Sequence, residues 1–154
     1  MICSLLLDNG KGSLPRVVRM GIPDEFPAGY GSQDTMMESF GLQPEQIAKR
    51  IQDLVCNVSG ISCSVGISGD KTTAKYAAKQ DKPYGITIIP PLDAESRLKN
   101  VPVDQLCGIG KGIKRFLNSH GVYKCGDMKT IPTSGLGKHF GHPGRRIWLR
   151  AQGK

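Results

Sequence analysis

Long apolar runs and paired cysteines are both missing from this 154-residue chain. No window approaches the roughly 18 apolar residues that a membrane-spanning helix needs, so we expect no membrane association. The five cysteines are odd in number, widely spaced and never arranged as C-x-x-C, which argues against a disulfide framework and a zinc site. Unpaired cysteines are typical of a reducing compartment, and we therefore expect a cytoplasmic protein.

Acidic residues are nearly absent from the last third of the chain. Residues 107–154 contain ten lysines and arginines but only one acidic residue, Asp127. Residues 1–106 carry eleven basic and twelve acidic side chains, so this part is close to neutral. A basic segment of this kind is typical of proteins that bind a polyanion, most often nucleic acid. The alternative interpretation is a solvated surface that serves solubility alone.

Hydrophobic periodicity predicts an α/β layer in the middle of the chain. We expect strands at residues 61–68 and 85–89, joined by a helix that Asp70 caps. A longer helix opens at Pro44 and ends at Gly60. Its apolar residues recur at helical spacing and predict one buried stripe: Ile47, Ile51, Leu54, Val55 and Val58.

Elements are also expected on both sides of this layer. Residues 16–22 have the character of a strand, and a short helix with Ser32 as its N-cap ends at Gly41. Another short helix is expected within residues 92–100, and a domain boundary near residues 100–104. Beyond this boundary the segments become short, helical and basic. The sequence therefore predicts an α+β protein with an all-helical end.

A glycine-rich turn precedes a basic helix in the sequence "CGIGKGIKRFLNSHGV", residues 107–122. Glycine permits the left-handed backbone of a tight turn and leaves the backbone N–H groups open to close approach. The N-terminus of the next helix attracts anions through those N–H groups and its dipole. We interpret the stretch as a helix-hairpin-helix that binds DNA phosphates through Gly108, Ile109, Gly110, Lys111, Gly112, Lys114 and Arg115.

Several side chains around this hairpin have further expected roles. Ile109 is expected to fasten the hairpin from inside. Arg145 and Arg146 are expected to form a second DNA contact, whereas Trp148 is expected in the helical core. The alternative is a compact helix-to-helix turn without a ligand.

These motifs resemble a Y-family, translesion DNA polymerase over residues 44–154. The stretch "SVGISGDKTTAKYAAKQDKPYG" resembles the family signature in its palm, and "VPVDQLCGIGKGIKRFLNSHGV" resembles the hairpin of its thumb. "CGDMKTIP" and "FGHPGRRIWLRAQG" resemble the last thumb helices. The resemblance implies a small palm-like α/β layer followed by an all-helical thumb with a helix-hairpin-helix. It also implies primer-template or duplex DNA as the partner.

The resemblance implies a nucleotide site as well. Lys82 matches the family lysine that contacts the triphosphate of the incoming nucleotide. Lys75 and Lys71 lie one turn apart on the preceding helix and can line the same anionic surface. Without the resemblance, Lys71, Lys75 and Lys79 would be read as a solvated helix face.

The carboxylates of the family are missing at their expected places. Y-family enzymes use two metal ions, Mg²⁺ in the complete enzyme, held by carboxylates in an N-terminal strand and an "S-x-D-E" motif. Neither motif occurs here, so we expect no cofactor and no catalysis by this chain alone. An active nucleotidyltransferase that uses Asp34, Glu38 and Asp8 or Asp24 is the alternative.

The beginning of the chain resembles something else. Residues 1–50, with "GIPDEFPAGYGSQD", resemble the end of a transketolase-type C-terminal domain of deoxyxylulose-phosphate synthases. This resemblance suggests a chimera whose transketolase-like part lacks the thiamine-binding machinery. One alternative is a polymerase relative with a diverged N-terminus. Another is a structural protein without a selected function. The expected division is 1–43 transketolase-like, 44–102 palm-like and 103–154 thumb.

Overall fold

The computed structural model describes residues 20–22, 24, 29 and 31–154, and the chain divides into two compact units, Met1–Gln43 and Pro44–Lys154. In the smaller unit, helix α2 (Gln33–Ser39) begins after Ser32, whose Oγ accepts a hydrogen bond from the Thr35 N–H. The predicted N-cap is therefore confirmed. Of the strand expected at 16–22, residues 16–19 lie outside the described residues, and residues 20–22 form no strand.

Helix α3 (Pro44–Ser59) opens the larger unit at the expected proline, but of its predicted buried stripe Ile47, Leu54 and Val55 are only half-buried, and the prediction is wrong for Ile51 and Val58. The buried residues of α3 are Ala48 and Gln52, whereas Ile51 is 41% exposed and Val58 is 63% exposed. Periodicity identifies the apolar face of a helix but not the face that meets its neighbours. Here a polar side chain, Gln52, faces the adjoining strands.

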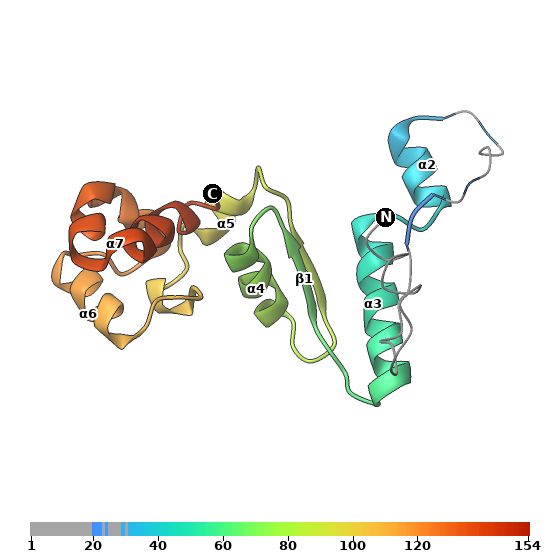
Figure 1. The fold of residues 1–154 in the computed structure, drawn as a ribbon, viewed down its shortest axis with the longest axis horizontal. Coiled ribbons are helices and arrows are strands. Elements are labelled where there is room, and N and C mark those ends of the chain that lie inside the picture. Colours follow the sequence, from blue (N-terminus) through green and yellow to red (C-terminus); the bar gives the residue numbers. More distant parts are fainter. Residues whose placement is uncertain (1–19, 23, 25–28, 30) are drawn as a thin grey trace, which may run out of the picture. The chain divides into compact units, whose positions relative to one another are not determined.

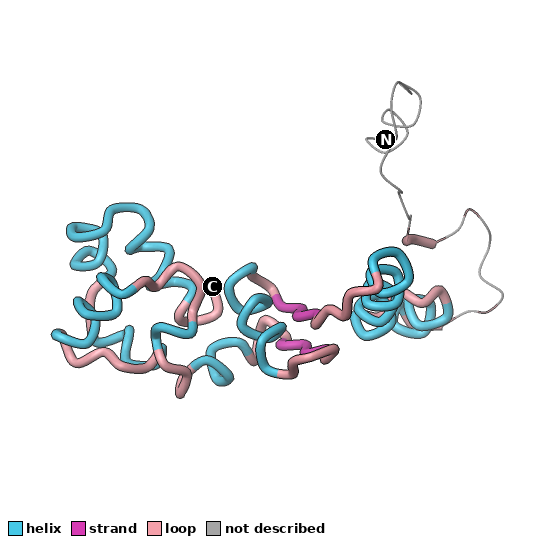
Figure 2. The backbone as a smooth tube through the Cα atoms, turned by 90° about the horizontal axis from the view of Figure 1, so that it is seen from below, coloured by secondary structure: helices cyan, strands magenta, loops and turns pink. Residues whose placement is uncertain are grey.

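The sheet has two parallel strands, β1 (Val65–Ser68) and β2 (Ile86–Ile89), with Val65 opposite Ile86. Figure 2 shows the two magenta strands side by side. Helix α4 (Lys71–Gln80) connects the end of β1 to the start of β2. The first strand is shorter than the expected residues 61–68. Residues 61–64 lie beyond the point where β2 begins, so they have no strand to pair with in the described part of the chain.

Helix α4 is fixed at its start and along its length. The Asp70 carboxylate accepts hydrogen bonds from the N–H groups of Thr72 (2.7 Å) and Thr73 (3.2 Å), which confirms the predicted cap. On strand β1, a side chain at Gly66 would overlap the Ala74 carbonyl oxygen. Only glycine therefore allows α4 to pack this closely against the strand.

The remaining chain is helical, as expected (Figure 1). Its buried side chains form the main hydrophobic core. Its elements are α5 (Ala94–Leu98), the 3₁₀ turn η1 (Val103–Gln105), α6 (Lys111–Ser119), η2 (Cys125–Thr130) and α7 (Thr133–Arg150). Helix α7 bends at Gly141, where φ is +61°. The core is built from fully buried side chains of every segment, among them Leu98, Val103, Leu117, Met128 and Leu136.

A smaller cluster of Ala77, Ile89 and Ala94 lies between α4, β2 and α5. Tyr76 of α4 is partly buried and packs against both clusters. The larger unit thus combines many helices with one small parallel sheet, which agrees with the expected α+β class. None of the helices in the described ranges has the length and apolar character needed to cross a bilayer.

Candidate nucleic-acid interface

Three lysines meet in a pocket beside the end of α4. The pocket has a volume of about 440 Å³, and we name it the lysine pocket. Lys75 and Lys79 come from successive turns of α4, and Lys82 comes from the loop that leads to β2. The other lining residues are Ser62, Cys63, Ser64, Ala78, Pro83 and Tyr84.

All the charged side chains that line the lysine pocket are positive. No carboxylate is among its lining residues, and none of its three lysines forms an ion pair within the part of the chain that the structure describes. The Ser62 and Ser64 hydroxyls add neutral hydrogen-bonding groups to the wall. Three ammonium groups without counter-charges, around one concavity, make a site suited to a polyanionic ligand such as a chain of phosphates.

The structure brings Lys75 and Lys82 together, as the sequence suggested, but not with Lys71. Lys71 stands at the first turn of α4 and does not line the pocket, whereas Lys79 does. The reason is the direction of the chain: Lys82 follows the last turn of α4, so the lysine nearest that end joins it. Lys79 lies four residues after Lys75, on the same helix face and nearer to Lys82 in the sequence, and these two signals together identify it.

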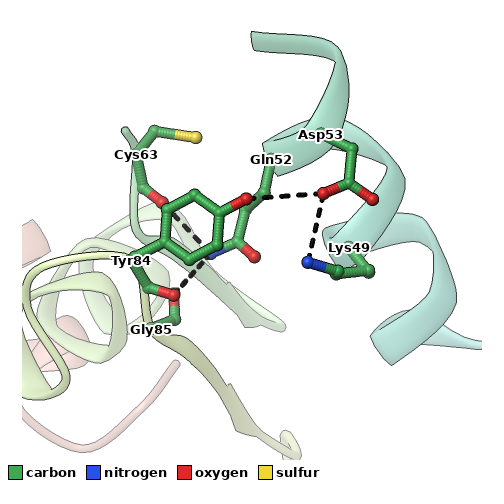
Figure 3. Close-up of polar contacts among 6 residues, drawn as sticks. All are labelled: Lys49, Gln52, Asp53, Cys63, Tyr84 and Gly85. Atoms are coloured by element: carbon green, nitrogen blue, oxygen red, sulfur yellow. Dashed lines mark hydrogen bonds and ion pairs between the residues drawn. The ribbon is translucent and has the colours of Figure 1, made fainter. Parts of the chain in front are cut away.

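One wall of the lysine pocket is held by Gln52 of α3 (Figure 3). The Gln52 side chain is 1% exposed, and its Nε2 lies 3.1 Å from the Cys63 carbonyl oxygen, 3.0 Å from that of Tyr84 and 3.1 Å from that of Gly85. An amide NH₂ has two protons, so the three carbonyls share them. Gln52 thereby ties α3 to the residues just before both strands. The sequence did not mark it, because a glutamine among the polar residues of an amphipathic helix is expected to face solvent.

The glycine-rich turn of residues 108–115, which we name the thumb hairpin, is only partly as expected. A single 3₁₀ turn, η1, stands where the first helix of the motif was predicted. Gly108 has a left-handed φ of +100°, but Gly110 has φ −84° and ψ 177°, an extended backbone that any residue adopts. The expected left-handed conformation at Gly110 is therefore wrong.

The burial of Ile109 in the thumb hairpin agrees with the prediction. Ile109 is 8% exposed and belongs to the main core, so it does fasten the turn from inside. Helix α6 begins at Lys111 without a side-chain cap, which leaves its N-terminal N–H groups available to an external acceptor. Lys111 and Arg115 are exposed.

Lys114 differs from its neighbours because it has an intramolecular partner. Its Nζ donates a hydrogen bond of 2.6 Å to the Asp104 carboxylate of η1. This hydrogen bond lowers the pKa of Asp104 from its ordinary value. Asp104 therefore stays charged at neutral pH and offsets one of the positive charges that the sequence assigned to DNA binding. The only acidic residue of the basic end, Asp127, instead accepts hydrogen bonds from the N–H groups of Tyr123 and Lys124.

Arg145 and Arg146 are exposed on the second half of α7. Within the described ranges, no hydrogen bond or ion pair links these two arginines to the thumb hairpin. Helices α6 and α7 do contact each other, because the centres of the Phe116 and Phe140 rings lie 5.1 Å apart. The Trp148 indole N–H donates to the Ile131 carbonyl oxygen at 2.8 Å, and the ring packs against the core, as predicted.

Among the described residues, the carboxylates proposed for an active nucleotidyltransferase do not form a metal site. Asp34 and Glu38 are exposed on α2, Asp24 is also exposed, and Asp8 lies outside the described residues. In residues 20–22, 24, 29 and 31–154, no group of three or more His, Cys, Asp or Glu side chains is placed to hold a metal ion. The described residues therefore do not fit the two-metal centre that the family resemblance implies.

Known proteins with similar sequences are DNA polymerases. A DNA polymerase IV of Streptococcus pyogenes serotype M1 is 34% identical over 108 residues, which are 70% of this chain and 30% of that polymerase. A DNA polymerase IV of Marinomonas sp. is 35% identical over 113 residues, 73% of this chain and 32% of that polymerase. No family model matches the chain.

Solved structures give the same result. DinB from Sulfolobus solfataricus has 26% sequence identity and a TM-score of 0.59, and the match covers 75% of this chain and 33% of DinB. A Y-family DNA polymerase chimera has 25% identity and a TM-score of 0.62, with 75% and 35% coverage. This chain is a relative of the Y-family DNA polymerases. It spans about a third of the length of these relatives, and none of them supports the transketolase-type resemblance of residues 1–50.

Proposed function

We propose that this Y-family relative is the DNA-binding palm and thumb portion of a lesion-bypass polymerase and serves DNA damage tolerance in the cytoplasm. In this proposal residues 44–102 form the palm-like part, and residues 103–154 form a thumb in which η1, the thumb hairpin and α6 act as a helix-hairpin-helix. The observation that carries the proposal is the lysine pocket. Its three lysines converge without counter-charges in the part of the fold that contains the family signature.

The lysine pocket is proposed to bind the phosphates of a nucleoside triphosphate. Lys82 and Lys75 make the principal contacts, and Lys79 adds a third charge from the same wall. Charge-assisted hydrogen bonds from ammonium groups to phosphate oxygens are about twice as strong as neutral ones. The pocket volume of about 440 Å³ lies within the range of small-molecule sites.

The thumb is proposed to bind the phosphates of duplex or primer-template DNA. The backbone N–H groups of Gly110, Lys111 and Gly112 approach a phosphate at the uncapped start of α6, with Gly108 and Ile109 shaping the turn. Lys111, Arg115, Arg145 and Arg146 supply charge, and Lys114 does so once it leaves Asp104. None of these contacts reads a base, so binding is independent of sequence.

Catalysis is not part of the function proposed for this chain alone. The described carboxylates form no cluster that fits the metal ions on which two-metal phosphoryl transfer depends. The proposal therefore assigns binding of DNA and nucleotide to this chain and no chemical step. Template-directed nucleotide incorporation by the purified chain with Mg²⁺ would contradict this and favour the active nucleotidyltransferase.

Titration calorimetry with inorganic tripolyphosphate tests the lysine pocket. Lys82→Ala is expected to weaken binding about tenfold or more, which is the loss of one charge-assisted contact. Lys71→Ala is the matched control, because it removes the same charge from the same helix outside the pocket. Equal affinities for both variants and the wild type would reject the phosphate site.

Anisotropy measurements with two unrelated duplexes at several salt concentrations test the thumb. The expected slope of log affinity against log salt is about −2 to −4, for a few phosphates. The slope should be the same for both duplexes. A flat salt dependence would show that the thumb hairpin is only a structural turn, and the chain would then fit the alternative of a structural protein.

A further inference from the structure

Tyr84 occupies an unusual position on the wall of the lysine pocket. It is the only non-glycine residue with a positive φ among the described residues, at +71°. For an aromatic residue this left-handed backbone is unfavourable, and such conformations persist only where the surroundings enforce them. A glycine or asparagine would adopt this backbone with less strain, so the contacts that hold the tyrosine are of interest.

The surroundings of Tyr84 do enforce its position (Figure 3). Its carbonyl oxygen accepts a hydrogen bond from Gln52 Nε2. Its hydroxyl donates to Asp53 Oδ1 at 3.4 Å, and Lys49 Nζ lies 3.1 Å from the same oxygen. Lys49 also stands 5.3 Å from the centre of the Tyr84 ring. Two residues of α3 thus orient the ring, and a third fixes the backbone.

The ring is anchored but not enclosed. Tyr84 is 39% exposed, and it lines the same pocket as Lys75, Lys79 and Lys82. A core tyrosine would be buried, and a solvated one would not be held from α3 by its hydroxyl and its carbonyl. One ligand could therefore place a planar group against the Tyr84 ring and its anionic groups against the three lysines.

We propose that Tyr84 is the subsite for the base of the nucleotide bound in the lysine pocket, and that its ring stacks on that base. This rests on the phosphate site proposed above and adds a second contact to it. Every nucleobase has a flat π-face, so the stacking is tolerant of sequence. The lysines then set the affinity for the triphosphate, and Tyr84 sets the preference for a nucleotide over inorganic tripolyphosphate.

The test compares two probes on the intact chain, dATP and inorganic tripolyphosphate, by titration calorimetry. The wild type is expected to bind dATP about tenfold more tightly than tripolyphosphate, in line with one stacked base. Tyr84→Asn removes the ring, and asparagine tolerates the left-handed backbone well. This variant should lose the tenfold preference and keep its affinity for tripolyphosphate.

Two further variants separate stacking from folding. Tyr84→Phe keeps the ring, loses the hydrogen bond to Asp53, and should keep most of the preference. Tyr123→Asn is the matched control, because Tyr123 is also exposed, at 60%, and does not line the pocket. Circular dichroism of each variant checks that the unit remains folded, and Tyr84→Gly repeats the test with a second residue that accepts a positive φ.

The possible outcomes distinguish the two proposals. If Tyr84→Asn binds dATP as the wild type does while Lys82→Ala weakens both probes, the base subsite is wrong and the phosphate site stands. A wild type that binds both probes equally also overturns the subsite. If Lys82→Ala changes neither probe, the phosphate site fails and the subsite with it.

Discussion

The lysine pocket and the thumb hairpin are both basic, yet their charges are arranged differently. In the pocket, three lysines from one helix and the loop after it face one concavity with no carboxylate among the lining residues. In the hairpin, Lys114 is already paired with Asp104 of the preceding 3₁₀ turn. Charge counted along the sequence ranks the thumb as the stronger anion site. The contacts instead place the denser group of lysines without neighbouring carboxylates in the near-neutral first two thirds of the chain.

Removing all three pocket lysines should give the largest difference between the two regions. The triple variant Lys75→Gln, Lys79→Gln, Lys82→Gln is expected to lower affinity for tripolyphosphate about 100-fold, because it removes every ammonium group of the pocket. Affinity for duplex DNA should fall less than about threefold, since the thumb hairpin is untouched. Calorimetry and anisotropy on the same preparation measure both. Equal losses would mean that DNA and triphosphate share one surface.

Gln52→Leu tests whether the pocket depends on its wall. The leucine fills the space but leaves the carbonyls of Cys63 and Tyr84 without the Gln52 donor, whereas the Gly85 carbonyl keeps the N–H of Val65. The expected cost is about 2 kcal/mol in the free energy of unfolding, because buried acceptors remain unsatisfied. Chemical denaturation measures it. Ile51→Gln, on the exposed face of the same helix, is the control and should cost less than about 0.5 kcal/mol.

The two glycines of the thumb hairpin should respond unequally to alanine. Gly108→Ala forces a side chain into the left-handed region and is expected to cost about 1 kcal/mol of stability. Gly110→Ala should cost less, since its backbone is extended and no atom lies within 4 Å of the added carbon. Thermal melts of both variants decide this. A larger shift for Gly110 would contradict the observed turn.

Asp104→Asn should have the smallest effect of these variants, a modest change in the affinity of the thumb hairpin for duplex DNA. It frees Lys114 for phosphate, so we expect duplex affinity to rise about threefold and the salt slope to steepen by up to about one charge. Lys114 lowers the pKa of Asp104. The Asp104–Lys114 ion pair is therefore intact at any pH above the ordinary pKa of an aspartate, and it is lost only as the pH falls through the lowered pKa. The difference between variant and wild type should therefore stay constant between about pH 6 and 8. A difference that vanishes within this range would rule out the pair as its cause.

Local signals predicted local structure well. Ser32 and Asp70 cap the helices that they were expected to cap, because such hydrogen bonds join residues two or three apart. The convergence of Lys75 and Lys82 also followed from the signature. Both strands were found, although β1 proved shorter because its length depends on its partner.

Long-range contacts could not be read from the sequence in the same way. Gln52 bonds to carbonyls 11 to 33 residues away, and nothing in the helix pattern marks this polar residue as one of the two buried residues of α3. The Asp104 partner of Lys114 comes from a separate turn. The stripe at Ile51 and Val58 failed because burial depends on which face meets a neighbour, and periodicity reports only polarity.

Tyr76 has a mechanical consequence. It follows Lys75 directly in α4 and packs against the small cluster beside the sheet and against the main core of the thumb. One side chain therefore joins the packing of the helix that carries a pocket lysine to the packing of the larger helical core. Truncation of Tyr76 would leave a gap in both clusters at once, so the sheet-side packing and the packing of the helical end share this residue.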